Sequence, residues 1–243
     1  MAQREHAVVT GGSSGIGLAV VRRLLDRGLA VTVFDRQPPP RLDGFPGLLQ
    51  DFRVDVSDED EVRDAFAAAA REAGPVRRLV ASHGIRGQFR PALDLDLDAC
   101  RRVLDVHVVG TLVVAREMVR ALGDPPASIV ALASTTAYRG WANQADYGVA
   151  KAAVRQLVEN LAIEWAGRGV RVNAVAPGHT LTPMVQQMID QGYDTGDTCA
   201  RTPLGRLADP GEQAGAIEFL LLDAPFVTGV CLPVDGGWTA VGK

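Results

Sequence analysis

The sequence predicts an α/β fold in which one parallel sheet carries helices on both faces. Short apolar runs rich in β-branched residues alternate with longer amphipathic segments along the whole chain. Most of the short runs lack the polar–apolar alternation of a half-exposed strand, which favours strands buried on both faces. This order is typical of a doubly wound parallel sheet. Ligands of such sheets bind beyond the carboxyl ends of the strands, so we expect the functional site there.

The individual elements follow from these runs and from their start signals. Strands are expected at residues 7–10, 30–34, 52–54, 79–82, 129–133, 170–176 and 230–234. Helices are expected at about 15–27, 58–73, 97–122, 147–167 and 210–222. Ser57 is the expected N-cap of the second helix, because the acidic residues 58–61 follow it and suit the positive end of a helix dipole. Asp209, Pro210 and Glu212 have the spacing of a capping box with proline at the first helical position.

Composition excludes several classes of protein. The 243 residues are 47% hydrophobic and 22% charged, and 25 Lys and Arg against 29 Asp and Glu leave a net charge of −4. This balance argues against a nucleic-acid-binding or disordered chain. No apolar run is long enough for a membrane span, and the polar segment Met1–His6 does not resemble a secretory signal, so we expect a cytoplasmic protein. The three scattered cysteines predict neither a disulfide framework nor a metal site.

A glycine-rich loop follows the first strand and opens the first helix. Its spacing, GxxxGxG, differs from the commoner GxGxxG fingerprint and from the P-loop. Glycines allow backbone to approach a pyrophosphate, whose charge is favoured at a helix N-terminus. An ordinary glycine-rich turn is the alternative. The candidate cofactor-binding residues of this loop are Gly11, Ser13, Ser14, Gly15, Ile16 and Gly17.

The end of the second strand indicates which dinucleotide binds. Asp35 lies about 20 residues beyond the glycines, where an acid accepts hydrogen bonds from the adenosine ribose hydroxyls. An acid there also repels a 2′-phosphate, and the glycine loop holds no basic residue to offset that repulsion. Arg36 follows immediately and is the one nearby residue suited to a phosphate. We therefore expect NAD rather than NADP.

Three further residues form a candidate acid–base set. Ser134 follows the fifth strand, and Tyr147 and Lys151 share one face of a helix one turn apart. An ammonium near a phenol lowers the pKa of that phenol, which makes tyrosine a usable acid or base near neutral pH. A serine hydroxyl at the same point can stabilise charge on a reacting oxygen. Each residue alone has an ordinary structural explanation, as a turn serine or a surface Tyr–Lys pair.

Together these motifs resemble the short-chain dehydrogenase/reductase family, whose fold is a single Rossmann-like domain. The resemblance extends to Asp55 and Val56 beside the adenine, and to a loop after the sixth strand that meets the nicotinamide carboxamide. It ends with the family's C-terminal signature at residues 234–237. It implies that Tyr147 is the acid/base, that Ser134 positions the substrate oxygen, and that Lys151 binds the nicotinamide ribose. The residues of the nicotinamide loop are Pro177, Gly178, Thr180 and Thr182.

The chain departs from the family pattern at two places. Where the family has Asn-Asn-Ala-Gly after the fourth strand, residues 81–84 read Ala-Ser-His-Gly, so Ser82 and Gly84 are the expected cofactor contacts. The family also places an asparagine at the position of His107, where it holds a water of a proton relay. His107 is either a relay member itself or a helix histidine that satisfies a neighbouring carbonyl. As a relay member it would make turnover depend on pH between about 5.5 and 7.5.

Substrate selectivity is expected in residues 83–89, 135–146 and 179–203, the last as a lid with a helical piece at 184–190. The favoured substrate contacts are Arg86, Trp141, Gln144 and Met184, with Tyr138, Arg139 and Asn143 as further candidates. The run 177–184 is similar to family members that oxidise dihydrodiols, which favours a small cyclic alcohol or ketone. The alternatives are a 3-oxoacyl-carrier-protein reductase that uses NADPH and a silent nucleotide-binding protein.

The motifs run from residue 11 to residue 237 and predict one catalytic domain over residues 1–243. The resemblance implies a homo-oligomer, a tetramer or a dimer, built through the helices near 97–122 and 147–167 and the C-terminal strand. Apolar residues on these helices suit either the core or an interface. They are Val103, Val106, Val113, Val114, Ala152 and Leu157.

Overall fold

A computed structural model describes residues 4–123 and 126–242 of the chain. At its centre lies a parallel seven-stranded sheet with the strand order β3-β2-β1-β4-β5-β6-β7. The order reverses between β1 and β4, which are neighbours in the sheet, so the predicted doubly wound fold is confirmed. Met1–Gln3, part of the segment that predicted no secretory signal, lie outside the described residues.

The strands agree with the predicted runs except at the sheet edge. They are β1 (His6–Thr10), β2 (Ala30–Asp35), β3 (Leu48–Arg53), β4 (Val76–Ala81), β5 (Ala127–Leu132), β6 (Val170–Pro177) and β7 (Cys231–Val234). β3 was predicted too late in the chain, at 52–54. It pairs with β2 from Leu48 onward and lies at the edge of the sheet, where one side is open to solvent. Polar residues such as Gln50 and Asp51 are therefore tolerated in it and hide the apolar pattern.

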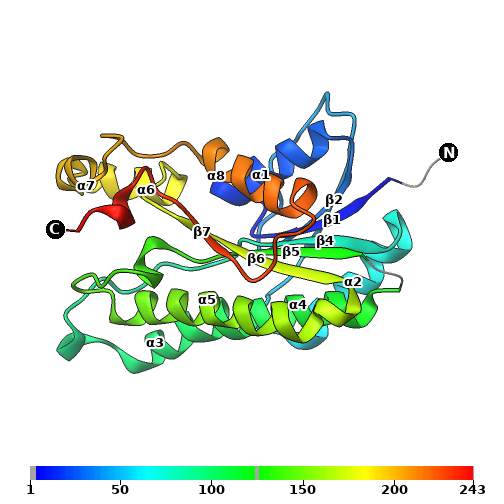
Figure 1. The fold of residues 1–243 in the computed structure, drawn as a ribbon, viewed down its shortest axis with the longest axis horizontal. Helices are drawn as coiled ribbons and strands as arrows, with labels where there is room; N and C mark the ends of the chain where they lie inside the picture. Colours follow the sequence, from blue (N-terminus) through cyan, green and yellow to red (C-terminus); the bar gives the residue numbers. More distant parts are fainter. Residues whose placement is uncertain (1–3, 124–125, 243) are drawn as a thin grey trace.

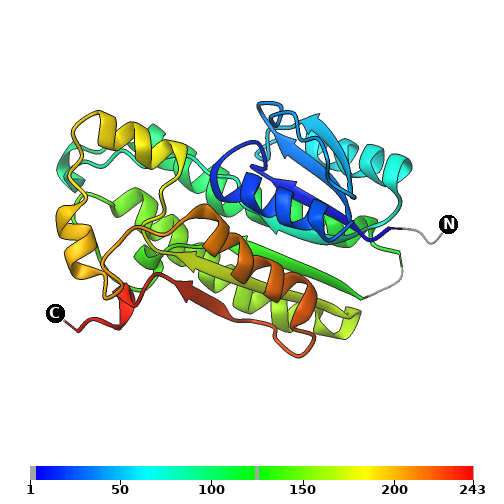
Figure 2. The same ribbon diagram turned by 90° about the horizontal axis from the view of Figure 1, so that it is seen from above.

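Helices cover both faces of the sheet. They are α1 (Gly15–Asp26), α2 (Glu59–Ala73), α3 (Leu97–Leu104), α4 (Gly110–Ala121), α5 (Ala145–Trp165), α6 (Pro183–Asp190), α7 (Gly196–Arg201) and α8 (Pro210–Glu218). α1 and α8 lie on one face, whereas α2, α3, α4 and α5 lie on the other (Figure 1). α6 and α7 lie beyond the carboxyl ends of the strands (Figure 2). The last helix begins with the predicted capping box of Asp209 and Glu212.

The predicted cap of α2 was one residue too early. The carboxylate of Asp58 accepts hydrogen bonds from the backbone N–H groups of Asp60 and Glu61, so Asp58 is the N-cap. The hydroxyl of Ser57 instead donates to the carboxylate of Asp55 at 2.6 Å. An aspartate is as good a cap as a serine, and here the neighbouring acid takes the serine hydroxyl.

The segment predicted as one helix at 97–122 is divided by a π-helical turn at Asp105–Val109. α3 precedes this turn and α4 follows it. π-helical turns are rare and occur often at functional sites, and this one contains His107. A second π-helical turn, Phe219–Asp223, ends the segment predicted at 210–222.

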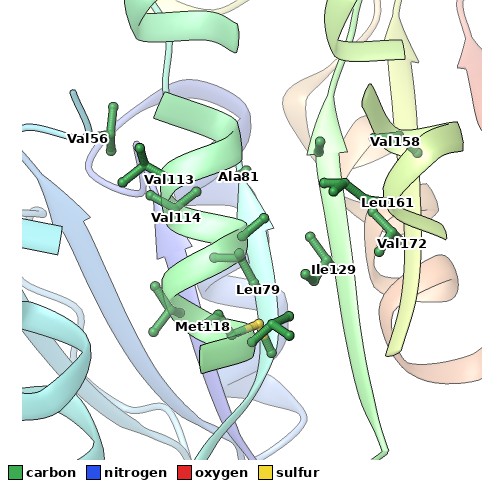
Figure 3. Packing of buried hydrophobic residues seen from close by; sticks show 14 of the residues in the cluster. Val56, Leu79, Ala81, Val113, Val114, Met118, Ile129, Val158, Leu161 and Val172 are labelled. Atoms are coloured by element: carbon green, nitrogen blue, oxygen red, sulfur yellow. The ribbon is translucent and has the colours of Figure 1, made fainter. Parts of the chain in front are cut away.

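Each face of the sheet has its own hydrophobic core. On one face, α4 packs Val113, Val114 and Met118 toward the sheet, and Val158 and Leu161 of α5 pack beside them (Figure 3). On the other face, residues of α1 and α8 form a second buried cluster. Val103 and Val106 are also buried, so these two and the α4 valines belong to the core rather than to an exposed interface. The two cores hold the strands in register and fix the positions of the loops at their carboxyl ends.

In the part of the chain that the structure describes, no helix combines the length and the apolar character needed to cross a membrane.

Candidate active site

The loops at the carboxyl ends of the strands enclose a cavity of about 480 Å³. The predicted catalytic residues, the favoured substrate contacts and all but one of the predicted cofactor residues line it. From the cofactor set these are Gly11, Ser14, Gly15, Ile16, Gly17, Asp35, Arg36, Asp55, Val56, Ser82, Gly84, Pro177, Gly178, Thr180 and Thr182. From the catalytic and substrate sets they are Ser134, Tyr147, Lys151, His107, Arg86, Trp141, Gln144 and Met184. Residues far apart in the sequence thus meet in one place.

The glycine loop is packed too tightly for side chains at two positions. A Cβ at Gly17 would collide with the Gly11 carbonyl oxygen and lie 2.6 Å from the Ser82 hydroxyl oxygen. Gly11 has a positive φ of 66°, which glycine adopts readily. The Ser14 side chain makes no capping hydrogen bond to α1. The first-turn N–H groups of α1 are therefore not capped by Ser14 and suit a pyrophosphate.

Ser13 is the predicted cofactor residue that does not line the cavity. Its backbone N–H donates to the Asp35 carboxylate at 3.1 Å, and its hydroxyl donates to the Gln37 carbonyl. The backbone N–H and the hydroxyl of Ser13 are therefore both bonded to residues at the end of β2 and just beyond it. Its prediction as a direct contact rested on its place in the motif, which does not show the direction of the side chain.

Asp35 closes the adenine end of the cavity. Its two carboxylate oxygens accept from the backbone N–H groups of Ser13 and Gln37, each at 3.1 Å. These bonds fix the carboxylate at the end of β2, while Arg36 is exposed to solvent. At the end of the neighbouring strand β3, Asp55 forms an ion pair with Arg102 of α3 at 3.1 Å. Hydrogen bonds from Ser57, together with Arg102, lower the pKa of Asp55.

Ser134, Tyr147 and Lys151 come from β5 and α5, which are packed together. Ser134 lies two residues beyond the end of β5, where its hydroxyl oxygen accepts from the Thr136 N–H at 3.2 Å. The Lys151 ammonium donates to the Leu132 carbonyl at the end of β5, at 2.7 Å. It lies 5.6 Å from the centre of the Tyr147 ring. The lysine is therefore buried beneath the tyrosine and anchored to the same strand as the serine.

In the ligand-free chain, burial and not the lysine charge decides the pKa of Tyr147. Burial raises this pKa to about 12, and the Ser134 hydroxyl acts weakly in the opposite direction. Burial also lowers the pKa of Lys151 to about 7, because the ammonium is 4% exposed and has no carboxylate partner among the described residues. The expected lowering of the tyrosine pKa by Lys151 is therefore wrong for the ligand-free chain.

His107 lies in the π-helical turn with its ring edge-on to the Tyr147 ring, 5.4 Å between centres. Its Nε2 lies 2.9 Å from the Ile85 carbonyl oxygen, and within the described residues its buried Nδ1 has no partner. Burial lowers the pKa of His107 to about 2, helped by the Lys151 charge. Burial therefore favours the neutral form of His107 in the ligand-free chain, and the dependence of turnover on its titration stays a prediction.

Asp146 is a site residue that sequence reasoning missed. It is 1% exposed, and its carboxylate accepts from the backbone N–H groups of Gln88 and Tyr147, at 2.9 and 2.7 Å. It thereby joins the loop after β4 to the first turn of α5. Asp146 precedes Tyr147 directly, but an acid in a first helical turn usually indicates only a favourable helix dipole.

His83 lines the cavity but is held from both sides. Its Nδ1 lies 2.6 Å from the Thr10 hydroxyl, and Thr111 lies 3.5 Å from its Nε2. Burial lowers its pKa to about 3. Ser82 beside it donates its hydroxyl to the Thr10 carbonyl. Ser82 and His83 occupy the positions where the family has asparagines, and both bond Thr10 of β1.

The expected substrate residues divide into two groups. Arg86, Trp141, Gln144 and Met184 line the cavity, and the Trp141 ring lies 4.9 Å from the ring of His179. Tyr138, Arg139 and Asn143 do not line it. The Tyr138 hydroxyl donates to the Cys231 carbonyl and Arg139 donates to Thr239, so both are bound to the C-terminal segment.

The segment 179–203 contains the predicted helical piece as α6 and a second helix, α7, that was not predicted. Met184, Val185 and Met188 of α6 line the cavity together with Tyr193. Within the described residues, no group of three or more His, Cys, Asp or Glu side chains is arranged to hold a metal ion.

Comparison with known proteins agrees with this geometry. A family model described as enoyl-(acyl carrier protein) reductase matches residues 11–239. The chain is 41% identical to cis-4-hydroxycyclohexanecarboxylate dehydrogenase of Sinomonas cyclohexanicum, over 97% of this chain and 96% of that protein. It is 34% identical to 2,5-dichloro-2,5-cyclohexadiene-1,4-diol dehydrogenase of Sphingobium indicum, over 96% of both proteins. The structure of Thermoplasma acidophilum aldohexose dehydrogenase matches with a TM-score of 0.91 and 28% identity, over 99% of this chain and 96% of that one.

These matches extend over nearly the whole chain, and the residues that carry the resemblance meet in one cavity. The chain therefore belongs to the short-chain dehydrogenase/reductase family and is an oxidoreductase that acts on CH–OH groups.

Proposed function

We propose that this enzyme transfers a hydride between NAD(H) and a secondary alcohol or ketone on a small cyclic substrate. The meeting of Ser134, Tyr147 and Lys151 beside the glycine loop in one cavity carries the proposal. A catalytically silent nucleotide-binding protein would have no need of a buried lysine held under a buried tyrosine. Burial of an ammonium is costly, and such perturbed groups cluster at functional sites.

The proposed roles follow from what each side chain can do. Tyr147 exchanges a proton with the substrate oxygen, and the Ser134 hydroxyl donates a hydrogen bond to that oxygen. Lys151 binds the nicotinamide ribose and contributes positive charge below the tyrosine ring. When bound, oxidised nicotinamide supplies the hydride acceptor and a further positive charge, which favours the phenolate of Tyr147. His107 acts as a neutral relay group through its Nδ1, which has no partner within the part of the chain that the structure describes.

The residues at the adenine end fit NAD better than NADP. The Asp35 carboxylate is fixed at the end of β2 by two backbone N–H groups. A 2′-phosphate would lie against this carboxylate and be repelled by it. Arg36 is the neighbouring cation and also lines the cavity, but the fixed Asp35 carboxylate stands directly beside it. We therefore propose NAD as the cofactor.

The substrate end favours a compact ring. Trp141, Met184 and Tyr193 give the cavity an apolar wall, and Gln144 and Arg86 add polar groups. The names of two relatives, a hydroxycyclohexanecarboxylate dehydrogenase and a cyclohexadienediol dehydrogenase, describe six-membered rings with hydroxyl groups. We propose that residues 179–203 form a lid over this end and that the whole chain works as one catalytic domain.

The alternative, reduction of a 3-oxoacyl group on an acidic carrier protein, requires a basic docking patch. The arginines available for one are paired with acids: Arg101 with Asp98, Arg102 with Asp55, and both Arg116 and Arg120 with Glu59. Paired arginines present little net charge to an acidic partner. This observation favours the small-molecule substrate.

A spectrophotometric screen at 340 nm tests the proposal. It uses NAD and NADP with cyclic diols, cyclic alcohols, cyclic ketones and acyl thioesters. We expect oxidation of a cyclic alcohol with NAD, and we expect Tyr147→Phe to lose at least a thousandfold in turnover while its affinity for NADH stays within about twofold. Strong NADPH-dependent reduction of an acyl thioester would overturn the proposal.

A further inference from the structure

We propose that the substrate carries a carboxylate and that Arg86 binds it. This inference rests on the proposed function, because it specifies which cyclic alcohols the same cavity accepts. Arg86 lies in the loop of residues 84–91, which follows β4 and lines the cavity.

The loop places Arg86 directly beside the proposed acid/base. A Cβ at Gly87 would lie 2.9 Å from the Cβ of Tyr147 and 2.8 Å from an oxygen of Asp146. The backbone at position 87 therefore rests against the first turn of α5, and only glycine fits there. Arg86 is the preceding residue, so its backbone lies one residue from this contact with the base of the Tyr147 side chain, and Arg86 lines the same cavity as Tyr147.

The neighbours of Arg86 are fixed by other contacts. The Ile85 carbonyl is 2.9 Å from His107 Nε2, and the Gln88 N–H donates to Asp146 at 2.9 Å. The Gln88 side chain bonds the backbone of Asp96 in both directions. Phe89 adopts a left-handed backbone with a φ of 55°, an uncommon conformation for a residue with a side chain. These contacts fix the loop on both sides of Arg86, which is the cavity-lining cation of the loop.

The charges around the cavity leave Arg86 without a protein partner. Three carboxylates line it. Asp35 and Asp55 lie at the adenine end, after β2 and β3, and Asp146 accepts hydrogen bonds from two backbone N–H groups. In the described ranges, no acid lies within ion-pair distance of Arg86. Arg102, another lining arginine, is by contrast paired with Asp55.

The chemistry of this end fits a ring that carries an acid. Trp141 and Met184 supply apolar surface for the ring, and Phe89 adds more at the mouth of the cavity. The guanidinium of Arg86 offers a planar fork of donors that matches a carboxylate in two parallel hydrogen bonds. A ring hydroxyl at Tyr147 and a carboxylate at Arg86 would fix the substrate at two points and so choose which ring carbon faces the hydride acceptor.

The test compares cis-4-hydroxycyclohexanecarboxylate with its neutral methyl ester as substrates of the wild type, Arg86→Met and Arg90→Met. Methionine keeps an apolar stem and removes the charge. Arg90 is exposed on the same loop but does not line the cavity, so it is the matched control. We expect Arg86→Met to lower kcat/KM for the acid about 10- to 100-fold, mainly through KM, and to leave the ester within about twofold. Arg86→Lys should restore part of the loss, because it keeps the charge without the fork.

Equal effects of Arg86→Met on the acid and the ester, or no effect on either, would overturn the inference while leaving the proposed function standing. If the wild type oxidises no cyclic alcohol, the proposed function fails and a binding measurement decides the inference. Calorimetric titration with cyclohexanecarboxylate, in the presence of NAD, should then show weaker binding to Arg86→Met than to Arg90→Met. Equal binding to the two variants would reject a carboxylate site at Arg86.

Discussion

At the scale of single residues, the catalytic set shows how burial competes with charge. The motif identified Tyr147 and Lys151, and the geometry brings them together with 5.6 Å between ammonium and ring centre. The motif did not indicate how deeply the pair is buried. Burial favours the neutral form of each group, so the pKa of Tyr147 rises to about 12 and that of Lys151 falls to about 7. We expect the positive charge of bound oxidised nicotinamide to lower the pKa of Tyr147 again.

The buried lysine predicts a pH dependence of stability. Its pKa is about 7 in the folded chain, against about 10.4 when unfolded. Between these values the unfolded chain binds more protons, so the free energy of unfolding rises with pH, by on the order of 1 kcal/mol per pH unit. Urea denaturation of the cofactor-free protein at pH 7.5, 8.5 and 9.5 measures this rise.

Lys151→Met is the control for that experiment, because methionine does not titrate. We expect the difference in unfolding free energy between Lys151→Met and wild type to shrink as the pH rises, at one fixed protein concentration. Parallel curves for the two proteins would show that Lys151 keeps its charge in the folded state, and the argument from burial would fail.

At the scale of elements, the glycine loop was the best predicted part of the site and the π-helical turn the least. GxxxGxG predicted a glycine-rich turn into the first helix, and the structure has a closely packed turn at Gly11 and Gly17, while the approach to a pyrophosphate stays a prediction. The turn at Asp105–Val109 has no comparable signal, because its residues continue the helical pattern of α3 and α4. The sequence pattern likewise does not indicate that Asp146 lies against the loop at Gly87. The hydrogen bond from Gln88 to Asp146 joins this loop to a helix 58 residues further along, and only the folded chain brings the two together.

The close packing at Gly17 predicts a sharp effect of one methyl group. Gly17→Ala would force its Cβ against the Gly11 carbonyl and the Ser82 hydroxyl, and so move the loop away from β4. We expect at least a tenfold loss in NADH affinity by fluorescence titration, and a melting temperature lower by several degrees. Gly167→Ala is the control, since a Cβ at Gly167 would meet nothing within 4 Å. Unchanged NADH affinity in Gly17→Ala would mean that the cofactor does not use this loop.

At the scale of the whole molecule, most of the fold was predictable because the central strands β2, β1, β4, β5 and β6 are largely buried between two helical layers and carry that burial in their sequence. Two elements were not predicted correctly. The edge strand β3 carries polar residues that hide its pattern, and the helix α7 has only six residues. Interfaces are harder to predict from the sequence, because an apolar residue on a helix suits either a core or an interface. Val113 and Val114 are buried in the core, whereas Ala152 and Leu157 remain at or near the surface of α5.

The outer face of α5 supports the expected homo-oligomer. Val149 and Ile163 of α5 are 58% and 81% exposed, and Val109, in the π-helical turn packed against α5, is 46% exposed. Exposed apolar side chains on neighbouring helices are typical of a symmetric interface. We expect the wild type to form an oligomer, so light scattering after gel filtration should give a mass that is a multiple of 25.8 kDa. Val149→Glu should give a smaller species, because it would bury a charge in the interface. Leu48→Glu at the far edge of the sheet, where Leu48 is 41% exposed, should leave the mass unchanged. A wild-type monomer at micromolar concentration would refute the interface.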